Sequence, residues 1–314
     1  MASRQERFVG IDVHKDTLEV HVEGRDDRWE FSNDTAGIGD LIMTFGPLSP
    51  TLVVVEASGG YERAVVSQGY AAGLPMVVVN PTRVRRLAEA MGIIAKTDAI
   101  DAQVIARFAS IIRPPVREPQ SAQQQHLNAL VTRRRQLVAM RTAEKNRLGT
   151  CPALVRAGIE QHVAWFDAEI EELEDEIHNM LVHDPSWHEL VELISSVPGI
   201  GEITAATLVA ELPELGTTSR QKIAALAGLA PYNRDSGPRR RTRRIFGGRA
   251  QVRCVLYMAT LSATRHNPAI RRFYERLIER GKEQKVALTA CMRKLLVIVN
   301  AMVRKQEHWQ YNPA

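Results

Sequence analysis

The sequence RFVGIDVHKDTLEVHVEG, residues 7–24, decides the fold of the N-terminal part of the chain. An apolar run leads into Asp12, and Leu18, Val20 and Val22 then alternate with polar residues. Strict alternation is the pattern of a half-buried strand, so the stretch predicts a β-hairpin. The sequence DRWEFSN that follows predicts a third strand.

Two further strands are predicted downstream by uninterrupted apolar runs, TLVVVEAS at residues 51–58 and PMVVVN at residues 75–80. Such runs are typical of parallel strands buried on both faces. Helices are expected before the first run, from near Tyr61, and from Pro81 to about Met91. The order β-β-β-α-β-α-β-α predicts an α/β domain at residues 1–115, with a mixed sheet and helices packed on it.

Strand signals stop after Pro115, and helical spacing of apolar residues takes over. Leucines at 127, 130 and 137 lie in a basic segment, and the repeat from Ile170 to Leu181 lies in an acidic one. We expect two long, paired helices in residues 116–188, acting as a spacer or as an oligomerisation arm. Residues 189–314 predict an all-α C-terminal domain.

The turn Pro-Gly-Ile-Gly at residues 198–201 precedes a helix rich in small residues and resembles the helix-hairpin-helix element of DNA-binding proteins. Glycines let backbone N–H groups approach a phosphate, and the following helix N-terminus attracts negative charge. The alternative is a glycine turn that joins two core helices.

Charge is unevenly distributed along the 314 residues, although the net charge is only +5. Eight arginines and a single acid, Asp235, lie between Arg234 and Arg253, whereas residues 167–176 contain seven acids and no base. The three cysteines have no C-x-x-C spacing, which favours a reducing compartment. We expect a cytoplasmic protein with no membrane partner, because the first ten residues lack an apolar core and Arg293 and Lys294 interrupt the most apolar helix.

Four carboxylates stand out by position: Asp12 in the first strand, Glu56 at the end of a buried strand, and Asp98 and Asp101 on one face of a predicted helix. Buried carboxylates cost free energy unless a partner compensates for the lost hydration. Taken singly, each has a structural alternative, namely a strand-end charge that reaches solvent or an aspartate that favours a helix dipole. An acid on the first strand, one on a later strand and one or two on a following helix is the order of the two-metal site in RNase H-like nucleases.

The motifs GIDVHKD, VVVEASGGYE and KTDAIDA resemble the acidic motifs of the DEDD transposases of bacterial insertion sequences, a group of bridge-RNA-guided recombinases. GLAPYNRDSGPRRRTRRIFGGRAQVR, VLYMAT and KVALTACMRKLL resemble that family's C-terminal transposase motifs, in the expected order. The resemblance implies an RNase H-like (RuvC-like) N-terminal domain whose metal ligands are Asp12, Glu56, Asp98 and Asp101, and it implies Ser236 as the nucleophile. It also implies a structured guide RNA and a dimer or tetramer. Carboxylate oxygens suit Mg²⁺, for which Mn²⁺ can substitute.

The arginines are the candidate nucleic-acid surface, and a solvated helix face or simple neutralisation of phosphates is the alternative. The candidates are Arg83, Arg85, Arg86, Arg133, Arg134, Arg234, Arg239, Arg240, Arg241, Arg243, Arg244, Arg249 and Arg253.

The sequence therefore predicts a DNA transposase or recombinase in which Ser236 attacks a phosphodiester with Mg²⁺ assistance. Two alternatives stay open. The first is a RuvC-like junction nuclease that uses the same carboxylates without a covalent intermediate. The second is a non-catalytic nucleic-acid-binding protein.

Overall fold

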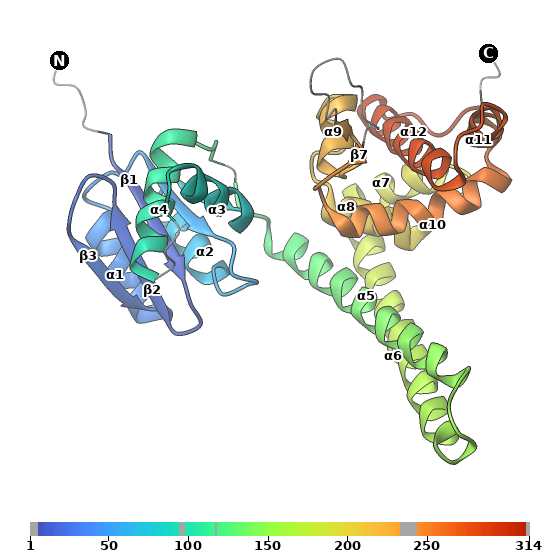
Figure 1. Ribbon diagram of the computed structural model, residues 1–314, viewed down its shortest axis with the longest axis horizontal. Coiled ribbons are helices and arrows are strands. Elements are labelled where there is room, and N and C mark those ends of the chain that lie inside the picture. The colour runs from blue at the N-terminus through green and yellow to red at the C-terminus, as the bar shows by residue number, and fades with distance from the viewer. Residues whose placement is uncertain (1–5, 94–97, 117, 233–243, 312–314) are drawn as a thin grey trace. The chain divides into compact units, whose positions relative to one another are not determined.

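The computed structural model describes residues 6–93, 98–116, 118–232 and 244–311, without the side chains of residues 98 and 99. The chain divides into two compact units, Met1–Gln120 and Ser121–Ala314 (Figure 1). The helices predicted at residues 116–188 belong almost wholly to the second unit, because Leu127, Ile177 and Leu181 share its core. The functional division into three domains stays a prediction.

A five-stranded mixed sheet forms the first unit, in the order β3-β2-β1-β4-β5. β1 pairs antiparallel with β2, β2 pairs antiparallel with β3, and β1, β4 and β5 run parallel. This is the predicted order of strands and helices, and it is consistent with an RNase H-like start. The elements are β1 (Phe8–Val13), β2 (Thr17–Val22), β3 (Arg28–Ser32), α1 (Thr35–Phe45), β4 (Leu52–Glu56), α2 (Arg63–Ala71), β5 (Met76–Val79), α3 (Pro81–Ala90) and α4 (Asp98–Ile112).

The two faces of the sheet bury different sets of residues. Val9, Ile11 and Val13 of β1 pack in one core with α1 and α2 residues such as Phe45 and Val65. On the other face, Phe8 packs in a second core with residues of α3 and α4. Alternate residues of β1 therefore face opposite helical layers, as strand geometry requires.

Helix α4 lies directly on β1, and Gly10 makes this approach possible. A Cβ atom at Gly10 would lie 2.2 Å from the Ala106 nitrogen and 2.4 Å from the Ala102 oxygen, both backbone atoms of α4. Any side chain at position 10 would push the helix away. The glycine of the GID motif thus fixes the distance between β1 and the helix that carries Asp101.

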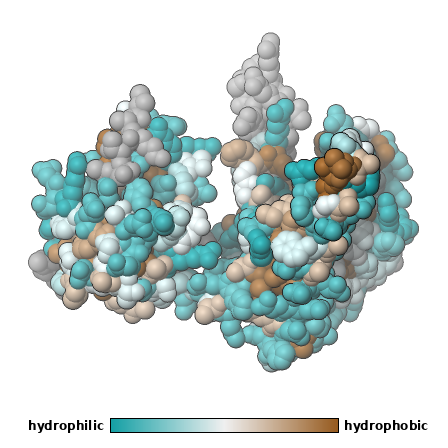
Figure 2. Space-filling model, turned by 90° about the horizontal axis from the view of Figure 1, so that it is seen from below, coloured by the Kyte–Doolittle hydropathy of each residue, from teal (hydrophilic) through white to brown (hydrophobic). Residues whose placement is uncertain are grey.

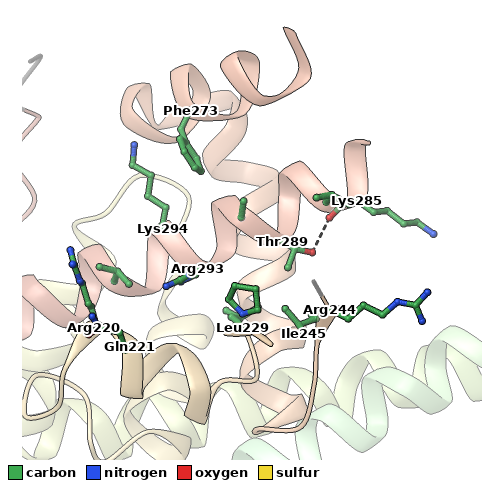
Figure 3. A pocket seen from close by; sticks show the side chains of 14 residues that line it. Arg220, Gln221, Leu229, Arg244, Ile245, Phe273, Lys285, Thr289, Arg293 and Lys294 are labelled. Carbon is green, nitrogen blue, oxygen red and sulfur yellow. Dashed lines mark hydrogen bonds between the residues drawn. The ribbon is translucent and has the colours of Figure 1, made fainter. Parts of the chain in front are cut away.

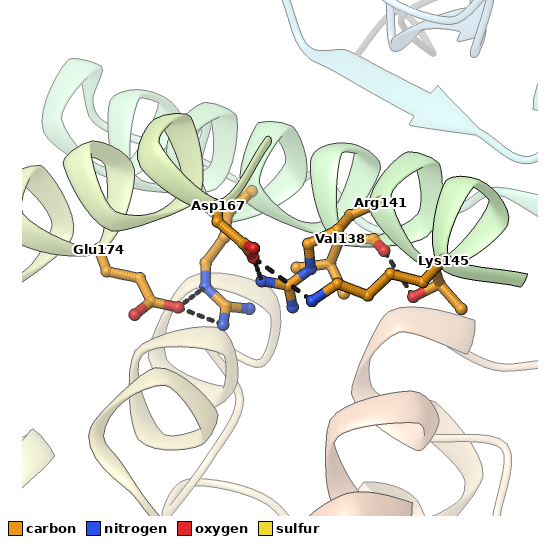
Figure 4. Close-up of polar contacts among 7 residues, drawn as sticks. Val138, Arg141, Lys145, Asp167 and Glu174 are labelled. Carbon is orange, nitrogen blue, oxygen red and sulfur yellow. Dashed lines mark hydrogen bonds and ion pairs between the residues drawn. The ribbon is translucent and has the colours of Figure 1, made fainter. Parts of the chain in front are cut away.

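The second unit begins with a long hairpin of α5 (Ala122–Leu148) and α6 (Ala153–His183), so the predicted pairing of a basic with an acidic helix is confirmed. Arg134 binds Glu174 across the hairpin, and Arg141 donates to Asp167 at 2.5 Å (Figure 4). Lys145 adds a contact of 3.6 Å to the same Asp167 carboxylate. Ion pairs between α5 and α6 therefore link the two helices, so these charged side chains do not face only solvent.

The remaining helices surround a single apolar core with the base of the hairpin. They are α7 (Pro185–Ser195), α8 (Glu202–Glu211), α9 (Arg220–Leu226), α10 (Ala250–His266), α11 (Pro268–Glu279) and α12 (Gln284–Lys305). The prediction of an all-α domain was wrong in one detail, because β6 (Pro231–Tyr232) and β7 (Arg244–Ile245) pair antiparallel. These strands are only two residues long, too short for a periodic pattern to show in the sequence.

Within the described part of the chain, α12 is long and apolar enough by composition to cross a membrane. Its residues Cys291, Leu295 and Val299 are fully buried in the core of the second unit, however. The face of the molecule shown in Figure 2 is mostly hydrophilic, with small hydrophobic patches among the polar residues. The apolar character of α12 is therefore explained by its place in the protein core.

Candidate functional site

Three carboxylates occupy neighbouring positions on adjacent strands of the sheet. Asp12 on β1 pairs with Glu19 on β2, and Ile11 pairs with Val55, so the next residues along these parallel strands are Asp12 and Glu56. All three alternate with the residues of the α1 core, which places them on the face covered by α3 and α4. Like charges side by side on a sheet repel one another, and a bound cation would relieve the repulsion.

Glu56 and Asp101 line one cleft of about 560 Å³, together with Arg85 and Arg86 of α3. Both acids are predicted ligands of one metal site, and the structure brings them to one cleft. Asp98 is the first residue of α4 and lies one helical turn before Asp101, but its side chain lies outside the described residues.

Local hydrogen bonds hold Asp12 at the end of β1. Its Oδ1 atom accepts from the Val13 backbone N–H at 3.0 Å, and its Oδ2 atom lies 3.4 Å from Nε2 of His14. The Asp12 side chain is 14% exposed. Asp12 thus keeps access to the surface although its strand is buried.

The loop after Glu56 is organised by Glu62, a residue that is not among the predicted site residues. Its Oε2 atom accepts from the backbone N–H groups of Ser58 and Gly60, at 3.1 and 2.8 Å, and from the Ser58 hydroxyl at 2.9 Å. Burial acts to raise the pKa of Glu62, but these hydrogen bonds outweigh it and hold the pKa below its ordinary value of 4.5. Glu62 therefore has a structural role in the VVVEASGGYE motif, and the four-residue spacing from Ser58 was the available signal.

Asn33 ties this loop to the start of the sheet. Its side-chain N–H group donates to the backbone oxygen of His14 at 2.8 Å and to that of Tyr61 at 3.2 Å. The segment after β1 and the segment after β4 are thereby held near each other, and each of them adjoins one carboxylate of the site. The sequence around Asn33 does not indicate these contacts, because they join three segments that lie far apart in the chain.

Carboxylates are the ligands expected for Mg²⁺ or Mn²⁺, so the chemistry of the donors fits a divalent ion. Among the residues with described side chains, no group of three or more His, Cys, Asp or Glu residues is close enough to hold a metal. The Asp98 side chain, the fourth predicted ligand, is not among these residues. The fit therefore rests on the Asp12 and Glu56 positions and on the cleft shared by Glu56 and Asp101.

The candidate arginines of α3 and α5 have different surroundings. Arg85 and Arg86 line the cleft, whereas the Arg83 guanidinium lies 5.3 Å from the centre of the Phe108 ring. Arg133 is exposed and lies 3.5 Å from the Gln136 side chain, and Arg134 binds Glu174. Of this group, the structure brings only Arg85 and Arg86 to the carboxylates.

Ser236 lies outside the described residues, as do Arg234, Arg239, Arg240, Arg241 and Arg243. The described chain on either side of them forms the short pair of strands β6 and β7.

A glycine-packed clasp flanks this pair of strands in the sequence and consists of Gly228, Gly247, Gly248 and the Arg253 side chain. All three glycines have positive φ angles. A Cβ atom at Gly228 would lie 2.1 Å from the Gly247 oxygen, and one at Gly248 would lie 2.1 Å from the Gly228 nitrogen. The Arg253 guanidinium donates to the backbone oxygens of Gly247 and Ala227. The glycines of GLAPY and FGGR therefore allow a backbone contact that fixes the base of the segment carrying Ser236.

Two of the candidate arginines of this region are engaged within the protein. Arg249 donates to both oxygens of Glu214, at 2.6 and 2.9 Å, and Arg253 completes the clasp. Arg244 on β7 is exposed and lines a cavity of the second unit. Binding of nucleic acid by any of the three stays a prediction.

The glycine turn at residues 198–201 joins α7 to α8, and packing explains its first glycine. A Cβ atom at Gly199, where φ is +100°, would lie 2.6 Å from the Ala263 nitrogen of α10. Glu202 occupies the first turn of α8, and its carboxylate would repel a phosphate at this helix N-terminus. The geometry thus supports the structural alternative, and a DNA contact at this turn stays a prediction.

Two family models match the chain. One for the DEDD transposases of the IS110 type, described as "Transposase", matches residues 9–151, and one described as "Transposase IS116/IS110/IS902 family" matches residues 191–275. The first range contains Asp12, Glu56, Asp98 and Asp101, and the second contains Ser236 and the clasp.

Several relatives agree with these matches. The chain is 26% identical over 309 residues to the pilin gene-inverting protein of Moraxella bovis, which covers 95% of this chain and 96% of the relative. It is 26% identical over 265 residues to the transposase for insertion sequence element IS1328 of Yersinia enterocolitica, which covers 73% and 75% of the two chains. An insertion element IS900 protein of Mycobacterium paratuberculosis is 34% identical over 137 residues, or 40% and 32% of the chains. The chain belongs to the IS110/IS116/IS902 family of DEDD transposases.

Proposed function

We propose that this transposase cuts and rejoins DNA by serine attack on a phosphodiester, with divalent metal ions held by Asp12, Glu56, Asp98 and Asp101. The observation that carries the proposal is the cleft in which Glu56 of β4 and Asp101 of α4 meet two arginines, beside Asp12 on the neighbouring strand. A cleft with both carboxylates and arginines is suited to bind a phosphodiester, because the carboxylates hold metal ions and the arginines attract the phosphate.

When bound, Mg²⁺ or Mn²⁺ supplies positive charge that stabilises the negative charge developing on the phosphate. The protein residues have separate roles. The carboxylates of Asp12, Glu56, Asp98 and Asp101 would hold the ions, and Arg85 and Arg86 would bind neighbouring phosphates of the same strand.

Ser236 would supply the nucleophile. Its oxygen forms a bond to phosphorus while the bond from phosphorus to a deoxyribose oxygen breaks, and the serine proton ends on that released hydroxyl group. Attack by the hydroxyl group of a second strand on the phosphoserine reverses the step. This second attack joins the new strands and regenerates the serine.

The oligomeric state and the choice of target also belong to the proposal. The carboxylates and Ser236 lie in different units of the chain, so the site would be completed within one protomer or between protomers of a dimer or tetramer. A structured RNA would select the DNA, as the resemblance to bridge-RNA-guided recombinases implies. The protein would act in the cytoplasm.

The test is a search for a covalent protein–DNA adduct on a denaturing gel after incubation of the protein, Mg²⁺, flanking RNA candidates and target DNA. The wild-type chain should form the adduct, and Ser236→Ala and Asp12→Asn should not. Strand cleavage retained in Ser236→Ala but lost in Asp12→Asn would replace the serine mechanism by the RuvC-like junction nuclease. DNA binding without cleavage by any variant, including the wild type, would favour the non-catalytic binding protein.

A further inference from the structure

The second unit contains a cavity of about 840 Å³ that the carboxylate site does not use. Its lining comes from α9, α11, α12, Leu229 and the two short strands β6 and β7 (Figure 3). Pro231 of β6 and Ile245 of β7 belong to this lining, and these strands lead into and out of the segment that carries Ser236. Whatever fills the cavity therefore lies beside the ends of that segment.

The lining combines an apolar wall with positive charge. Leu229, Ile245, Val286 and Val297 are among its apolar residues, and none of the lining residues that the structure describes is a carboxylate. The lining cations are Arg220, Arg244, Lys285, Arg293 and Lys294.

Most of these cations are available to a ligand. Within the described chain, Arg220, Arg244, Lys285 and Arg293 form no ion pair. Lys294 is different, since its Nζ atom donates to the Ala269 oxygen at 3.2 Å and lies 4.6 Å from the centre of the Phe273 ring. Burial lowers the pKa of Lys294, and the nearby Arg276 lowers it further. A cluster of uncompensated cations repels itself, so a bound anion would stabilise it.

We infer that this cavity holds one unstacked nucleotide of the DNA strand, with its base against the apolar wall and its phosphates on the surrounding cations. Ligand pockets of roughly 300–1,000 Å³ are the usual size for small organic groups, and the cavity falls in that range. A base has apolar faces and a phosphate is an anion, so one nucleotide matches both parts of the lining. The choice of DNA rests on the proposed function, because the strand attacked by Ser236 must pass the ends of its segment.

The experiment measures binding of the full-length protein to a fluorescein-labelled 15-nucleotide oligo(dT) strand and to a duplex of the same length, by anisotropy. Val286→Trp fills the cavity mouth from a side chain that is 50% exposed, and Arg293→Ala removes a lining cation. The matched controls lie on α11 outside the lining: Ile278→Trp at a position that is 40% exposed, and Arg271→Ala. Thermal unfolding of each variant establishes that it is folded.

Val286→Trp and Arg293→Ala should each weaken single-strand binding by about fivefold or more, while duplex binding changes less than twofold, because each variant removes a base or phosphate contact that only an unstacked nucleotide makes. The controls should change neither affinity by more than about twofold. Equal losses in Arg293→Ala and Arg271→Ala, or an unchanged affinity in Val286→Trp, would overturn the inference. Tighter binding of oligo(U) than of oligo(dT) would overturn the assignment to DNA.

This assay requires no cleavage, so its outcome is separate from the covalent-adduct test. If the wild-type protein forms no adduct while the cavity variants still weaken single-strand binding, the serine mechanism alone is contradicted. A photocrosslink from a single 5-iododeoxyuridine in the strand gives an independent check, since it should attach to peptides of α11 or α12.

Discussion

Asp12 lies between two other acidic residues of the sheet, Glu19 on β2 and Glu56 at the end of β4. The register of three strands, not the sequence near any one residue, creates this neighbourhood. Asp12 and Glu56 were identified from their positions in apolar runs and from the family motifs. Glu19 was missed because it reads as an ordinary polar residue of an alternating strand. Cross-strand neighbours depend on register, which a pattern of period two does not determine.

At the catalytic carboxylates, we expect Glu56→Gln to lower Mg²⁺-dependent DNA cleavage by at least about a hundredfold, because the amide removes a negative ligand of the metal. Asp40→Asn in α1 is the control, since it removes one negative charge at an exposed position of a helix that packs on the other face of the sheet. Rates of strand cleavage at fixed protein and DNA concentrations give the comparison. Similar losses in both variants would mean that the overall charge of the unit matters rather than the Glu56 ligand.

The depressed pKa of Glu62 predicts how stability depends on pH. The group is more acidic in the folded protein than its ordinary value of 4.5, so its contribution to stability is complete above that pH. The contribution is lost as the pH falls through the lower, folded-state pKa. Glu62→Gln should therefore be less stable than wild type at neutral pH, and the difference between them should shrink below about pH 4.5. Urea unfolding at a series of pH values measures this, and a constant difference down to pH 3 would refute it.

At the scale of elements, α4 and β1 form the contact on which the site depends. Gly10→Ala should destabilise the first unit by about 1–3 kcal/mol, since its Cβ atom would meet the backbone of α4 rather than a side chain that can move. Gly39→Ala in α1 is the control, because nothing lies within 4 Å of its Cβ position and the helix interior favours alanine by about 0.5–1 kcal/mol. The free energies of unfolding should therefore change in opposite directions. Cleavage activity should fall in Gly10→Ala, because α4 also carries Asp101.

The elements themselves were largely predictable. The alternating and continuous apolar runs predicted all five strands of the first unit in order, and leucine and isoleucine spacing predicted the long hairpin of α5 and α6. Contacts between distant elements were not predictable, among them the approach of α4 at Gly10 and the clasp of Gly228 with Gly247 and Gly248. A glycine that permits close packing and a glycine that permits a turn look the same in one sequence. The cavity of the second unit was missed for a similar reason, although Arg293 and Lys294 in an otherwise apolar helix were a visible signal.

The clasp provides a second prediction at this scale. Gly228 has a positive φ angle and no space for a Cβ atom. We therefore expect Gly228→Ala to displace the chain at Gly247 and to destabilise the second unit by about 1–3 kcal/mol. Gly158→Ala in α6 is the control, with nothing within 4 Å of its Cβ position, and it should be stabilising. Thermal unfolding measures both. If Ser236 needs a fixed base for its segment, Gly228→Ala should also reduce the covalent adduct, and an undiminished adduct would contradict that role.

At the scale of the whole molecule, the two units have separate apolar cores, and the candidate metal ligands all lie in the first. The hairpin of α5 and α6 belongs to the second unit through the same core as α7 to α12. The proposed chemistry needs both units, since the carboxylates lie in one and Ser236 in the other. Metal binding should consequently be visible in the stability of the first unit alone, whereas formation of the adduct needs the whole chain.

Metal removal provides the prediction that separates the units. A ligand that binds only the folded state stabilises it by about 2.7 kcal/mol at a hundred times its dissociation constant, which raises the unfolding midpoint of a domain of this size by roughly 10 °C. Calorimetry of the full chain should show a transition of the first unit that shifts upwards with Mn²⁺ and returns with EDTA, while the transition of the second unit stays in place. Asp12→Asn should abolish the shift, because the amide removes a negative ligand of the ion. Asp40→Asn, at an exposed position of α1, should retain the full shift. A shift that persists in Asp12→Asn, or one that occurs in both transitions, would show that the ion binds elsewhere.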